Sequence, residues 1–444
     1  MDIQEKKRLF KYLAKHYDSM DYPPIMLYRN IKRERIKIGW RKRVKEILKG
    51  AIDYPGMYVH IPYCRTKCFF CKFRTRVANS EEILDKYLKC LNREIDEFSP
   101  IFKKLSFKTL YLGGGTPTIL SASQLDSLFN ILEKRFNLKE TVQRLIESTP
   151  VTLSLDRLGI LRKHGFNRLT IGVQTVDKKI IKLINRSNQT EDMVREAFFK
   201  ARSSGMEFIN LDLMLGLPGQ TIHSFLKDLR FILSLKPEAI HINPLEEDEQ
   251  VILLRKEKKI KEGDRNKMNE MLESADIEIK KYGYQYYRNE PYVLSPQAAN
   301  LQDQLRFFSN GSLLGLGAGA LAYIPNHYTY HNNVLEDYLN YRAKGNFPPY
   351  IQGYPLTKRE SILNYVVHNI RSGINRKMFS SIFGVRLDKE FRIEFESLRK
   401  LRRLQEDKDS IKLVANNNLE FRTYSKFFFS PKVVKELRQK VCDK

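Results

Sequence analysis

The sequence has 444 residues, of which 42% are hydrophobic and 11% aromatic, so it can form two or three domains with a sizeable core and is not a disordered polymer. Its formal net charge of +26 favours a polyanionic partner, either nucleic acid or an anionic membrane, although a solvated basic surface explains the same excess. The charged start MDIQEKKRLFKYLAKHYDSM argues against a secretory signal, and no run of about 18 apolar residues predicts a spanning helix. We therefore expect a cytoplasmic protein, in which clustered thiols act as metal ligands.

Residues 1–50 form a basic segment that we expect to be helical. Positions 29–49 hold ten Lys or Arg residues against two Glu residues. The apolar residues that fall at helical spacing in this stretch are Trp40, Val44, Ile47 and Leu48. Two interpretations stay open: the helix lies on the anionic inner face of a membrane, or it packs on the rest of the protein and exposes its basic residues.

Short apolar runs alternate with helical segments from residue 57 to about residue 300. The runs that predict buried parallel strands are MYVHI (57–61), TLYLGG (109–114), RLIEST (144–149), RLTIGV (168–173), FINLDLMLG (208–216) and AIHIN (239–243). Segments between them, such as SEEILDKYLKCLNREIDEF and TEDMVREAFFKARSSG, predict helices. Repeated strand–helix units predict an α/β fold, open or barrel-like, with its site at the carboxyl ends of the strands.

The strict alternation stops after residue 300. The stretch 311–325 (GSLLGLGAGALAYIP) is rich in small residues, and the stretches 356–373 and 380–404 predict helices. The tail KLVANNNLEFRTYSKFFF (412–429) predicts a short hairpin. We therefore expect three parts: the basic N-terminal segment 1–50, a barrel over 51–300, and a mainly helical C-terminal domain over 301–444 that ends in a small hairpin.

Three of the five cysteines crowd the loop that follows the first strand. Cys64, Cys68 and Cys71 have the spacing C-x3-C-x2-C, which suits three thiolates on one face of an iron–sulfur cluster. A closed zinc site would need a fourth ligand, for which His60 is the candidate. Three ligands on a four-iron cluster leave one iron open, where a reactive molecule can bind.

These motifs together resemble the radical S-adenosylmethionine (SAM) superfamily, in the branch of the oxygen-independent coproporphyrinogen III oxidases, the haem chaperones and the class C methyltransferases. The resemblance rests on YVHIPYCRTKCFFC, YLGGGTPT, IESTP, GFNRLTIGVQT, INR and NLDLMLGLPGQT between residues 58 and 221, and on the looser LLGLGAGALAYI. It implies a partial (β/α)6 barrel, a [4Fe–4S] cluster on the three cysteines, two SAM molecules, and an electron donor such as flavodoxin or ferredoxin.

The resemblance also implies which residues contact SAM. They are Tyr58, Phe70, Gly114, Gly115, Thr116, Glu147, Gln174, Arg186, Asp212 and Leu321. The two acids lie at or near the ends of apolar strands, where a buried carboxylate needs a cationic partner. Alternatives stay open for three of these residues: simple packing for Phe70, an ordinary surface role for Arg186, and backbone amides as the partners of Asp212.

Departures from the family patterns bear on the reaction. The oxygen-independent coproporphyrinogen III oxidase is a decarboxylase. It has an R-Y-T-S-Y-P-type segment and a further cysteine two residues after the last ligand, where this chain has MDYPPIMLYRN and Lys72–Phe73. The chaperone motif H-N-x-x-Y-W is replaced by ANLQDQLRFF. Gln174, Arg186 and Asp212, by contrast, match positions at which the decarboxylase holds a second SAM, and two SAM molecules suit a class C methyltransferase. We therefore expect a class C methyltransferase that methylates an sp2 carbon of a conjugated ring, with a menaquinone at the inner face of the membrane as the candidate substrate. The alternatives are tetrapyrrole chemistry, namely coproporphyrinogen III decarboxylation or anaerobic haem ring opening, and a haem chaperone; no RNA-binding module supports a nucleic-acid partner.

Overall fold

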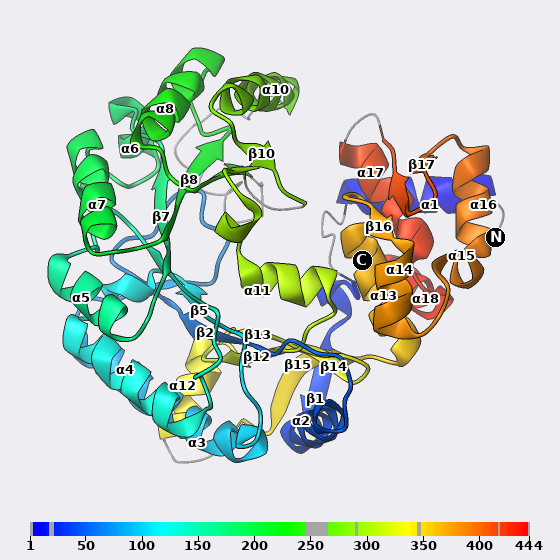
Figure 1. The fold of residues 1–444 in the computed structure, drawn as a ribbon, viewed down its shortest axis with the longest axis horizontal. Helices are drawn as coiled ribbons and strands as arrows, with labels where there is room; N and C mark the ends of the chain where they lie inside the picture. The colour runs from blue at the N-terminus through cyan, green and yellow to red at the C-terminus, as the bar shows by residue number, and fades with distance from the viewer. Residues whose placement is uncertain are drawn as a thin grey trace.

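The fold is built on one open sheet that bends around a central space, with helices along its outer side and a helical domain beside it (Figure 1). The computed structural model describes residues 3–16, 22–245, 252, 265–288, 292–343, 348–415 and 418–442. Within these residues, no helix is both long and apolar enough to cross a membrane. The α/β fold with a partial barrel, as the sequence predicts, is confirmed.

The sheet has thirteen strands in the order β1-β15-β14-β13-β12-β2-β5-β6-β7-β8-β9-β11-β10. Its parallel centre consists of β12 (Leu313–Leu316), β2 (Gly56–Ile61), β5 (Thr109–Gly114), β6 (Gln143–Ser148), β7 (Arg168–Gln174), β8 (Phe208–Leu215) and β9 (Ala239–Pro244). All six predicted strands are therefore present. They were detectable because a parallel strand covered on its outer face has a continuous apolar run.

Antiparallel strands extend this sheet at both edges. They are β13 (Leu321–Ile324), β14 (Tyr328–His331), β15 (Tyr350–Pro355) and β1 (Arg29–Lys32) on one side, and β11 (Tyr292–Val293) and β10 (Gln285–Tyr286) on the other. The sheet thus continues across residue 300, where the sequence suggests a division of the chain. The three-part division itself stays a prediction.

Helices cover the outer side of the sheet, and most of them connect its parallel strands (Figure 1). They are α3 (Glu81–Phe102), α4 (Ala122–Arg135), α5 (Leu155–Lys163), α6 (Lys178–Leu183), α7 (Glu191–Ser203), α8 (Ile222–Leu235) and α10 (Arg265–Lys281). The short α11 (Leu301–Asp303) lies on the inner side instead. Capping boxes at Ser121–Gln124 and Thr221–Ser224 fix where α4 and α8 begin, because each satisfies backbone amides that the first helical turn leaves free.

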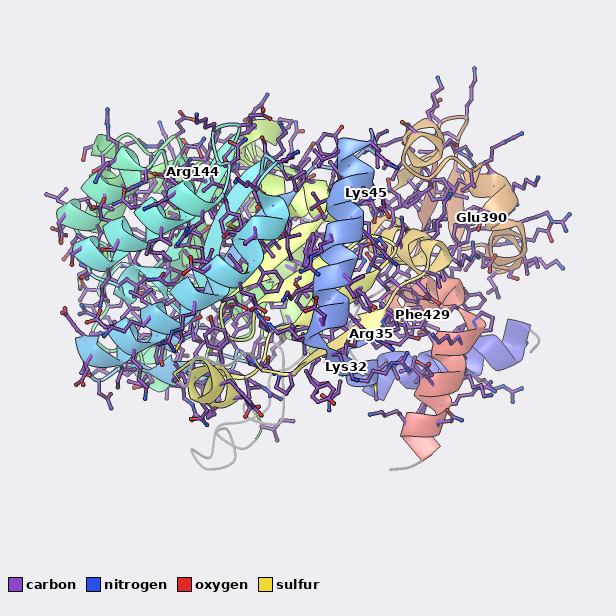
Figure 2. The ribbon with its side chains drawn as sticks, turned by 90° about the horizontal axis from the view of Figure 1, so that it is seen from below. Lys32, Arg35, Lys45, Arg144, Glu390 and Phe429 are labelled. Atoms are coloured by element: carbon purple, nitrogen blue, oxygen red, sulfur yellow. The ribbon has the colours of Figure 1, made fainter. Side chains whose placement is uncertain are left out.

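The basic N-terminal segment packs on the protein through its apolar side. It contains α1 (Ile3–His16), β1 and α2 (Arg33–Leu48). Trp40 on α2 is 1% exposed, its ring meets that of Phe102 edge-on at 5.0 Å, and its Nε1 donates to the Tyr330 hydroxyl at 2.9 Å. Figure 2 shows α2 crossing the molecule with the exposed Arg35 and Lys45 along its length and the exposed Lys32 just before its first residue. The structure favours packing on the protein over a position on the membrane surface, because the Trp40 face is already buried.

The C-terminal domain is mainly helical, as predicted. Its elements are α13 (Lys358–Asn369), β16 (Ile374–Asn375), α14 (Arg376–Phe383), α15 (Leu387–Glu390), α16 (Arg392–Lys400), β17 (Leu404–Glu406), β18 (Ser410–Leu413), α17 (Asn418–Ser425) and α18 (Pro431–Cys442), while α12 (Leu335–Ala343) packs on α3. The N-terminal α1 joins this domain, with the ring of Phe10 5.4 Å from that of Phe427.

The predicted terminal hairpin is wrong in its position. The hairpin is formed earlier, by β17 and β18, and the tail that follows it is helical. Phe421, Tyr424 and Phe428 fall at helical spacing and all three are buried, so this stretch presents one helical face to the core. The run FFF after Lys426 resembles a strand locally, although its first two residues belong to a short 3₁₀ turn.

Candidate active site

The loop that carries the three cysteines follows β2 and closes on itself. Its ends are joined because β3 (Tyr63–Cys64) pairs with β4 (Arg76–Val77). The Cys71 amide donates to the Cys68 carbonyl at 3.2 Å, which forms a tight turn between these two residues. Cys64, Cys68 and Cys71 are all half-buried free thiols. The loop therefore presents its thiols at the carboxyl edge of the sheet.

The glycine-rich turn after β5 holds the first cysteine in place. The amides of Gly115 and Thr116 donate to the carbonyls of Ile61 and Tyr63, both at 2.8 Å, and the Thr116 hydroxyl hydrogen-bonds Cys64 Sγ at 3.4 Å. A Cβ on Gly115 would lie 2.5 Å from the Tyr63 oxygen and 2.9 Å from Cys64 Sγ. Only glycine allows this approach, so the turn and the cysteine loop form one packed unit.

The segment after α6 holds the second cysteine. Asn185 donates from its side chain to the Lys67 carbonyl at 2.9 Å, and Arg186 donates to the Gly172 carbonyl at 2.8 Å. Burial raises the pKa of Cys68, and the Arg186 guanidinium, which hydrogen-bonds the thiol, opposes that rise. Arg186 is 8% exposed, so it is not an ordinary surface arginine.

The three thiols fit an iron–sulfur cluster. Burial raises the pKa of Cys64 to about 11, the Thr116 hydrogen bond opposes that rise, and the charges of Cys71 and Cys68 add to it, so the three sulfurs are electrostatic neighbours. In the part of the chain that the structure describes, no three Cys, His, Asp or Glu side chains gather closely enough for a single metal ion. A cluster distributes its thiolates over different irons. His60, the fourth ligand in the zinc alternative, is instead within hydrogen-bond distance (2.9 Å) of the Tyr58 hydroxyl.

Glu147 on β6 has hydrogen-bond donors but no cationic partner among the residues that the structure describes. The Tyr111 hydroxyl donates to one carboxylate oxygen, and the Gly114 amide donates to the other at 3.1 Å. Burial raises the pKa of Glu147 to about 7; the Tyr111 and Gly114 hydrogen bonds oppose the rise, and the charges of Asp212 and Asp303 add to it. Within the described residues no Lys, Arg or His forms an ion pair with Glu147. The carboxyl group is therefore suited to a cationic ligand.

Asp212 on β8 is also a carboxylate that has a hydrogen-bond donor but no cationic partner among the described residues. The Asn210 side chain donates to its Oδ1 at 2.6 Å, so the hydrogen-bond partner is a side chain rather than the backbone amides of the alternative interpretation. Burial raises the pKa of Asp212 to about 7, against the opposing effects of Asn210 and of the charges of Arg168 and Arg186. None of the described cationic side chains lies within ion-pair distance of it.

Gln174 ends the strand between these two acids. Glu147 on β6 and Asp212 on β8 lie opposite Thr170 and Gly172 of β7, so β7 separates them. Gln174 has a φ of 71° at an irregularity in the register, a left-handed conformation that is unusual for a residue with a side chain. Its Oε1 is buried without a hydrogen-bond partner among the described residues. An unpaired buried acceptor at a strand end indicates a ligand site.

The remaining residues of the predicted site lie around this edge. Tyr58 is on β2, with its ring 5.4 Å from that of Tyr111. Phe70 is half-buried and packs on a small apolar cluster that contains Phe69 and Met214, so packing accounts for part of its surface. Leu321 is the half-buried first residue of β13.

Sequence reasoning missed three side chains that surround the acids. They are Tyr111, Asn210 and Asp303. The two-residue period of a strand could have identified Asn210, because it shares a face with Asp212. No local signal identifies Asp303, which reaches the site from α11.

The open parallel sheet and the three-cysteine loop after its first central strand define a radical SAM protein. The family model of the Radical SAM superfamily matches residues 58–232. The chain belongs to this superfamily, in the branch that contains the haem chaperones and the oxygen-independent coproporphyrinogen III oxidases. Membership implies a [4Fe–4S] cluster and SAM as cofactors.

Three relatives define the branch. The chain is 30% identical over 336 residues to the heme chaperone HemW of Bacillus subtilis, covering 74% of this chain and 87% of that protein. It is 28% identical over 350 residues to the oxygen-independent coproporphyrinogen III oxidase of Salmonella typhimurium, covering 74% and 76%. The solved structure of coproporphyrinogen III oxidase (HemN) from Escherichia coli matches the fold with a TM-score of 0.78 at 24% identity, over 94% of this chain and 98% of that one.

These comparisons correct the reaction expected from the sequence. The relatives are named as coproporphyrinogen oxidases and haem chaperones, and the preference for a class C methyltransferase acting on a menaquinone finds no support among them. Gln174, Arg186 and Asp212, which suggested a second SAM molecule, do not distinguish a methyltransferase from a decarboxylase, because the resemblance places a second SAM in the decarboxylase as well.

Proposed function

We propose that this radical SAM enzyme acts on a tetrapyrrole and that its reaction is the oxidative decarboxylation of propionate side chains of coproporphyrinogen III. The similarity of the fold to HemN, over 94% of this chain and 98% of that one, supports this proposal. The relatives named as oxygen-independent coproporphyrinogen III oxidases support it at the level of sequence.

The observation that carries the choice of coproporphyrinogen III is the similarity to the oxygen-independent coproporphyrinogen III oxidases. A pair of acids at the carboxyl edge of the sheet supports the SAM-dependent part of the proposal. Glu147 and Asp212 flank β7, and each has neutral donors but no ion-pair partner among the described residues. Such carboxylates bind ammonium or sulfonium groups, both of which SAM carries. Two acids on either side of one strand suit two SAM molecules.

The chain's own residues hold the reactants in this scheme. Cys64, Cys68 and Cys71 would bind the cluster, which when reduced supplies the electron that cleaves SAM to methionine and a 5′-deoxyadenosyl radical. Glu147 would accept a hydrogen bond from a SAM ammonium, and Arg186, oriented by backbone carbonyls, would bind a carboxylate. A propionate that loses one hydrogen atom, CO2 and one electron becomes a vinyl group, so the reaction also needs an electron acceptor.

The second candidate is a haem-binding role of the chaperone type. Two observations favour it: the 30% identity to HemW, and Lys72–Phe73 at the place where the decarboxylase has a further cysteine. The third candidate is the anaerobic opening of a haem ring at the same site. All three share a tetrapyrrole ligand and differ in whether SAM is consumed and in what is released.

The electron donor that we propose is a small acidic carrier such as flavodoxin or ferredoxin. The cysteine loop has no acidic residue between positions 63 and 77, while Arg65, Lys72 and Arg74 are exposed on it. Phe73, 55% exposed, gives this basic surface an apolar centre. Charge complementarity accelerates the encounter of such partners.

The experiment that tests the function is product analysis. Anaerobically reconstituted protein with dithionite, SAM and coproporphyrinogen III should form 5′-deoxyadenosine and CO2, and the Cys68→Ala variant should form neither. S-adenosylhomocysteine without CO2 would instead indicate methyl transfer. Haem retained through purification, with no SAM cleavage, would indicate the carrier.

A further inference from the structure

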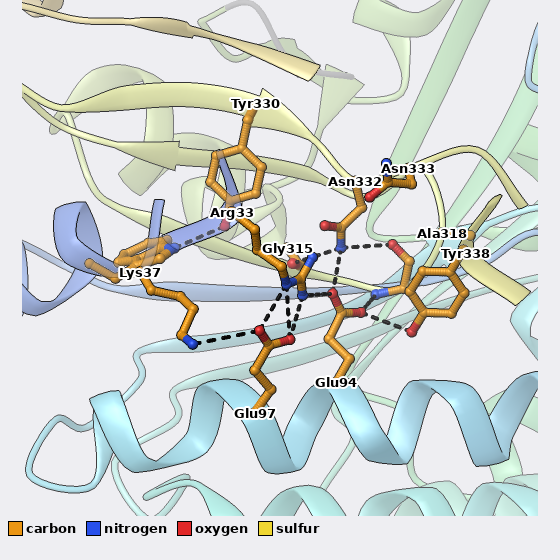
Figure 3. Close-up of polar contacts among 12 residues, drawn as sticks. Arg33, Lys37, Glu94, Glu97, Gly315, Ala318, Tyr330, Asn332, Asn333 and Tyr338 are labelled. Atoms are coloured by element: carbon orange, nitrogen blue, oxygen red, sulfur yellow. Dashed lines mark hydrogen bonds and ion pairs between the residues drawn. The ribbon is translucent and has the colours of Figure 1, made fainter. Parts of the chain in front are cut away.

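A buried network connects the basic N-terminal helix to the glycine loop 317–320 (Figure 3). At its centre is Glu94 on α3, whose side chain has no exposed surface. Among the groups that donate to its carboxylate are the Gly317 amide at 2.7 Å, the Tyr338 hydroxyl at 2.9 Å, the Asn332 side chain at 3.1 Å and the Arg33 guanidinium at 3.2 Å. These donors come from four separate segments of the chain, so Glu94 fixes their mutual positions.

Arg33 supplies the charge that allows a carboxylate at this depth. It is the first residue of α2 and also binds Glu97, with its Nε at 2.8 Å and its Nη2 at 2.6 Å from the two carboxylate oxygens. Its guanidinium lies 5.2 Å from the centre of the Phe98 ring. A buried carboxylate that loses its cationic partner is strongly destabilising. The network therefore depends on the N-terminal segment.

The loop that Glu94 holds is pressed against β2. Gly317 has a φ of 96°, and a Cβ on it would lie 2.5 Å from both the His60 carbonyl oxygen and the Tyr87 hydroxyl. Tyr87 donates to that carbonyl at 2.6 Å and accepts from the Ala318 amide at 3.1 Å. The Asn332 side chain donates to the Gly317 carbonyl at 3.0 Å. The loop is thus clamped beside the strand that leads into the cysteine loop.

We propose that Glu94 is a positioning residue for SAM: it holds the loop 317–320, and with it Leu321, at the distance from β2 that the SAM pocket requires. This inference rests on the proposed function in taking SAM as the ligand, and on the family resemblance in taking Leu321 as a SAM contact. In this account Arg33 acts through Glu94 and touches no reactant. The basic N-terminal segment then belongs to the scaffold of the active site.

The chain provides a matched control at the other end of β12. Asp53 accepts from the Ser312 amide at 2.7 Å and pairs with Arg43 of α2 at 2.8 Å. The Asp53 side chain has no exposed surface, as for Glu94. The two acids therefore make the same kind of contact, but Asp53 holds the amino end of β12, away from the cysteines.

The test compares Glu94→Gln with Asp53→Asn in the full-length holoenzyme. Hydrogen exchange of residues 317–321 without SAM reports whether the loop is held, and equilibrium dialysis gives the dissociation constant of SAM. Glutamine has one acceptor oxygen where glutamate has two, so we expect about 10- to 100-fold faster exchange and a similar rise in the SAM dissociation constant. SAM cleavage at saturating SAM should stay close to that of the wild type, and Asp53→Asn should change neither quantity.

Each other outcome overturns the inference. Unchanged exchange in Glu94→Gln means that Glu94 does not hold the loop. Faster exchange with unchanged SAM affinity means that the loop does not position SAM, while SAM cleavage by the wild type would leave the proposed function intact. An equal effect of Asp53→Asn means general loosening. Should Glu94→Gln not fold, Tyr338→Phe removes one hydrogen bond to Glu94 and should give about a threefold to tenfold change in both quantities.

Discussion

Glu147→Gln should stabilise the SAM-free protein at alkaline pH much more than at acidic pH. The carboxyl group has a pKa of about 7 in the fold, against 4.5 for an ordinary glutamate. Above pH 4.5 the unfolded chain gains free energy by ionising, whereas the folded chain does not ionise until about pH 7, so stability falls between these values and then levels off. The raised pKa of Glu147 thus lowers the unfolding free energy by about 1 kcal/mol at pH 5.5 and by about 3 kcal/mol at pH 8.5.

Glutamine does not ionise, so the variant escapes this penalty. The difference in unfolding free energy between variant and wild type should therefore grow by about 2 kcal/mol from pH 5.5 to pH 8.5, which corresponds to about 2 °C in Tm for a chain of this length. Thermal unfolding at the two pH values measures it. The control is Glu140→Gln, because the hydrogen bond from Lys108 lowers the pKa of that exposed acid and no alkaline gain is expected. If the difference in unfolding free energy between Glu147→Gln and the wild type stays constant with pH, Glu147 is not a buried acid that lacks a cationic partner.

Three further predictions concern other parts of the molecule. Trp40→Ala should destabilise the protein by about 3–5 kcal/mol in denaturant unfolding, because it removes a buried ring, and should leave binding to anionic vesicles unchanged; loss of vesicle binding in a protein that remains folded would restore the membrane interpretation. Gly115→Ala should reduce the iron bound after reconstitution several-fold, since its Cβ meets the Tyr63 carbonyl oxygen, and full iron content would contradict the packing described. Arg74→Glu should weaken binding and reduction by an acidic flavodoxin but not reduction by dithionite, whereas Lys45→Glu on the exposed side of α2 should not; equal effects of both would indicate a nonspecific charge effect.

The central sheet was predictable because its strands are covered on one side by helices and filled with apolar residues. The edge strands were not, because their pairing is between segments far apart in the chain: β1 at residues 29–32 pairs with β15 at 350–355. Nothing local in RNIK indicates that partner. The prediction of a terminal hairpin was wrong for a related reason. Aromatic residues occur in strands and helices alike, and only the burial seen in the fold shows that these residues share one face of a helix.

The candidate site also has features that the sequence predicts and features that only the fold reveals. Cys64, Cys68 and Cys71 lie within eight positions of the sequence, so their spacing alone indicates a cluster. Glu147 and Asp212 could be recognised as buried acids in need of a cation, but the absence of an ion-pair partner among the described residues required the fold. The reaction could not be derived from sequence departures, because the features that suggested methyl transfer are shared with the decarboxylase.

The most direct test of the central claim is the fate of one hydrogen atom. Coproporphyrinogen III deuterated at the propionate carbon next to the ring, incubated anaerobically with the reconstituted enzyme, dithionite and SAM, should transfer a single deuterium to 5′-deoxyadenosine as CO2 is released. Unlabelled 5′-deoxyadenosine together with S-adenosylhomocysteine, or no SAM cleavage at all, would contradict a tetrapyrrole decarboxylase.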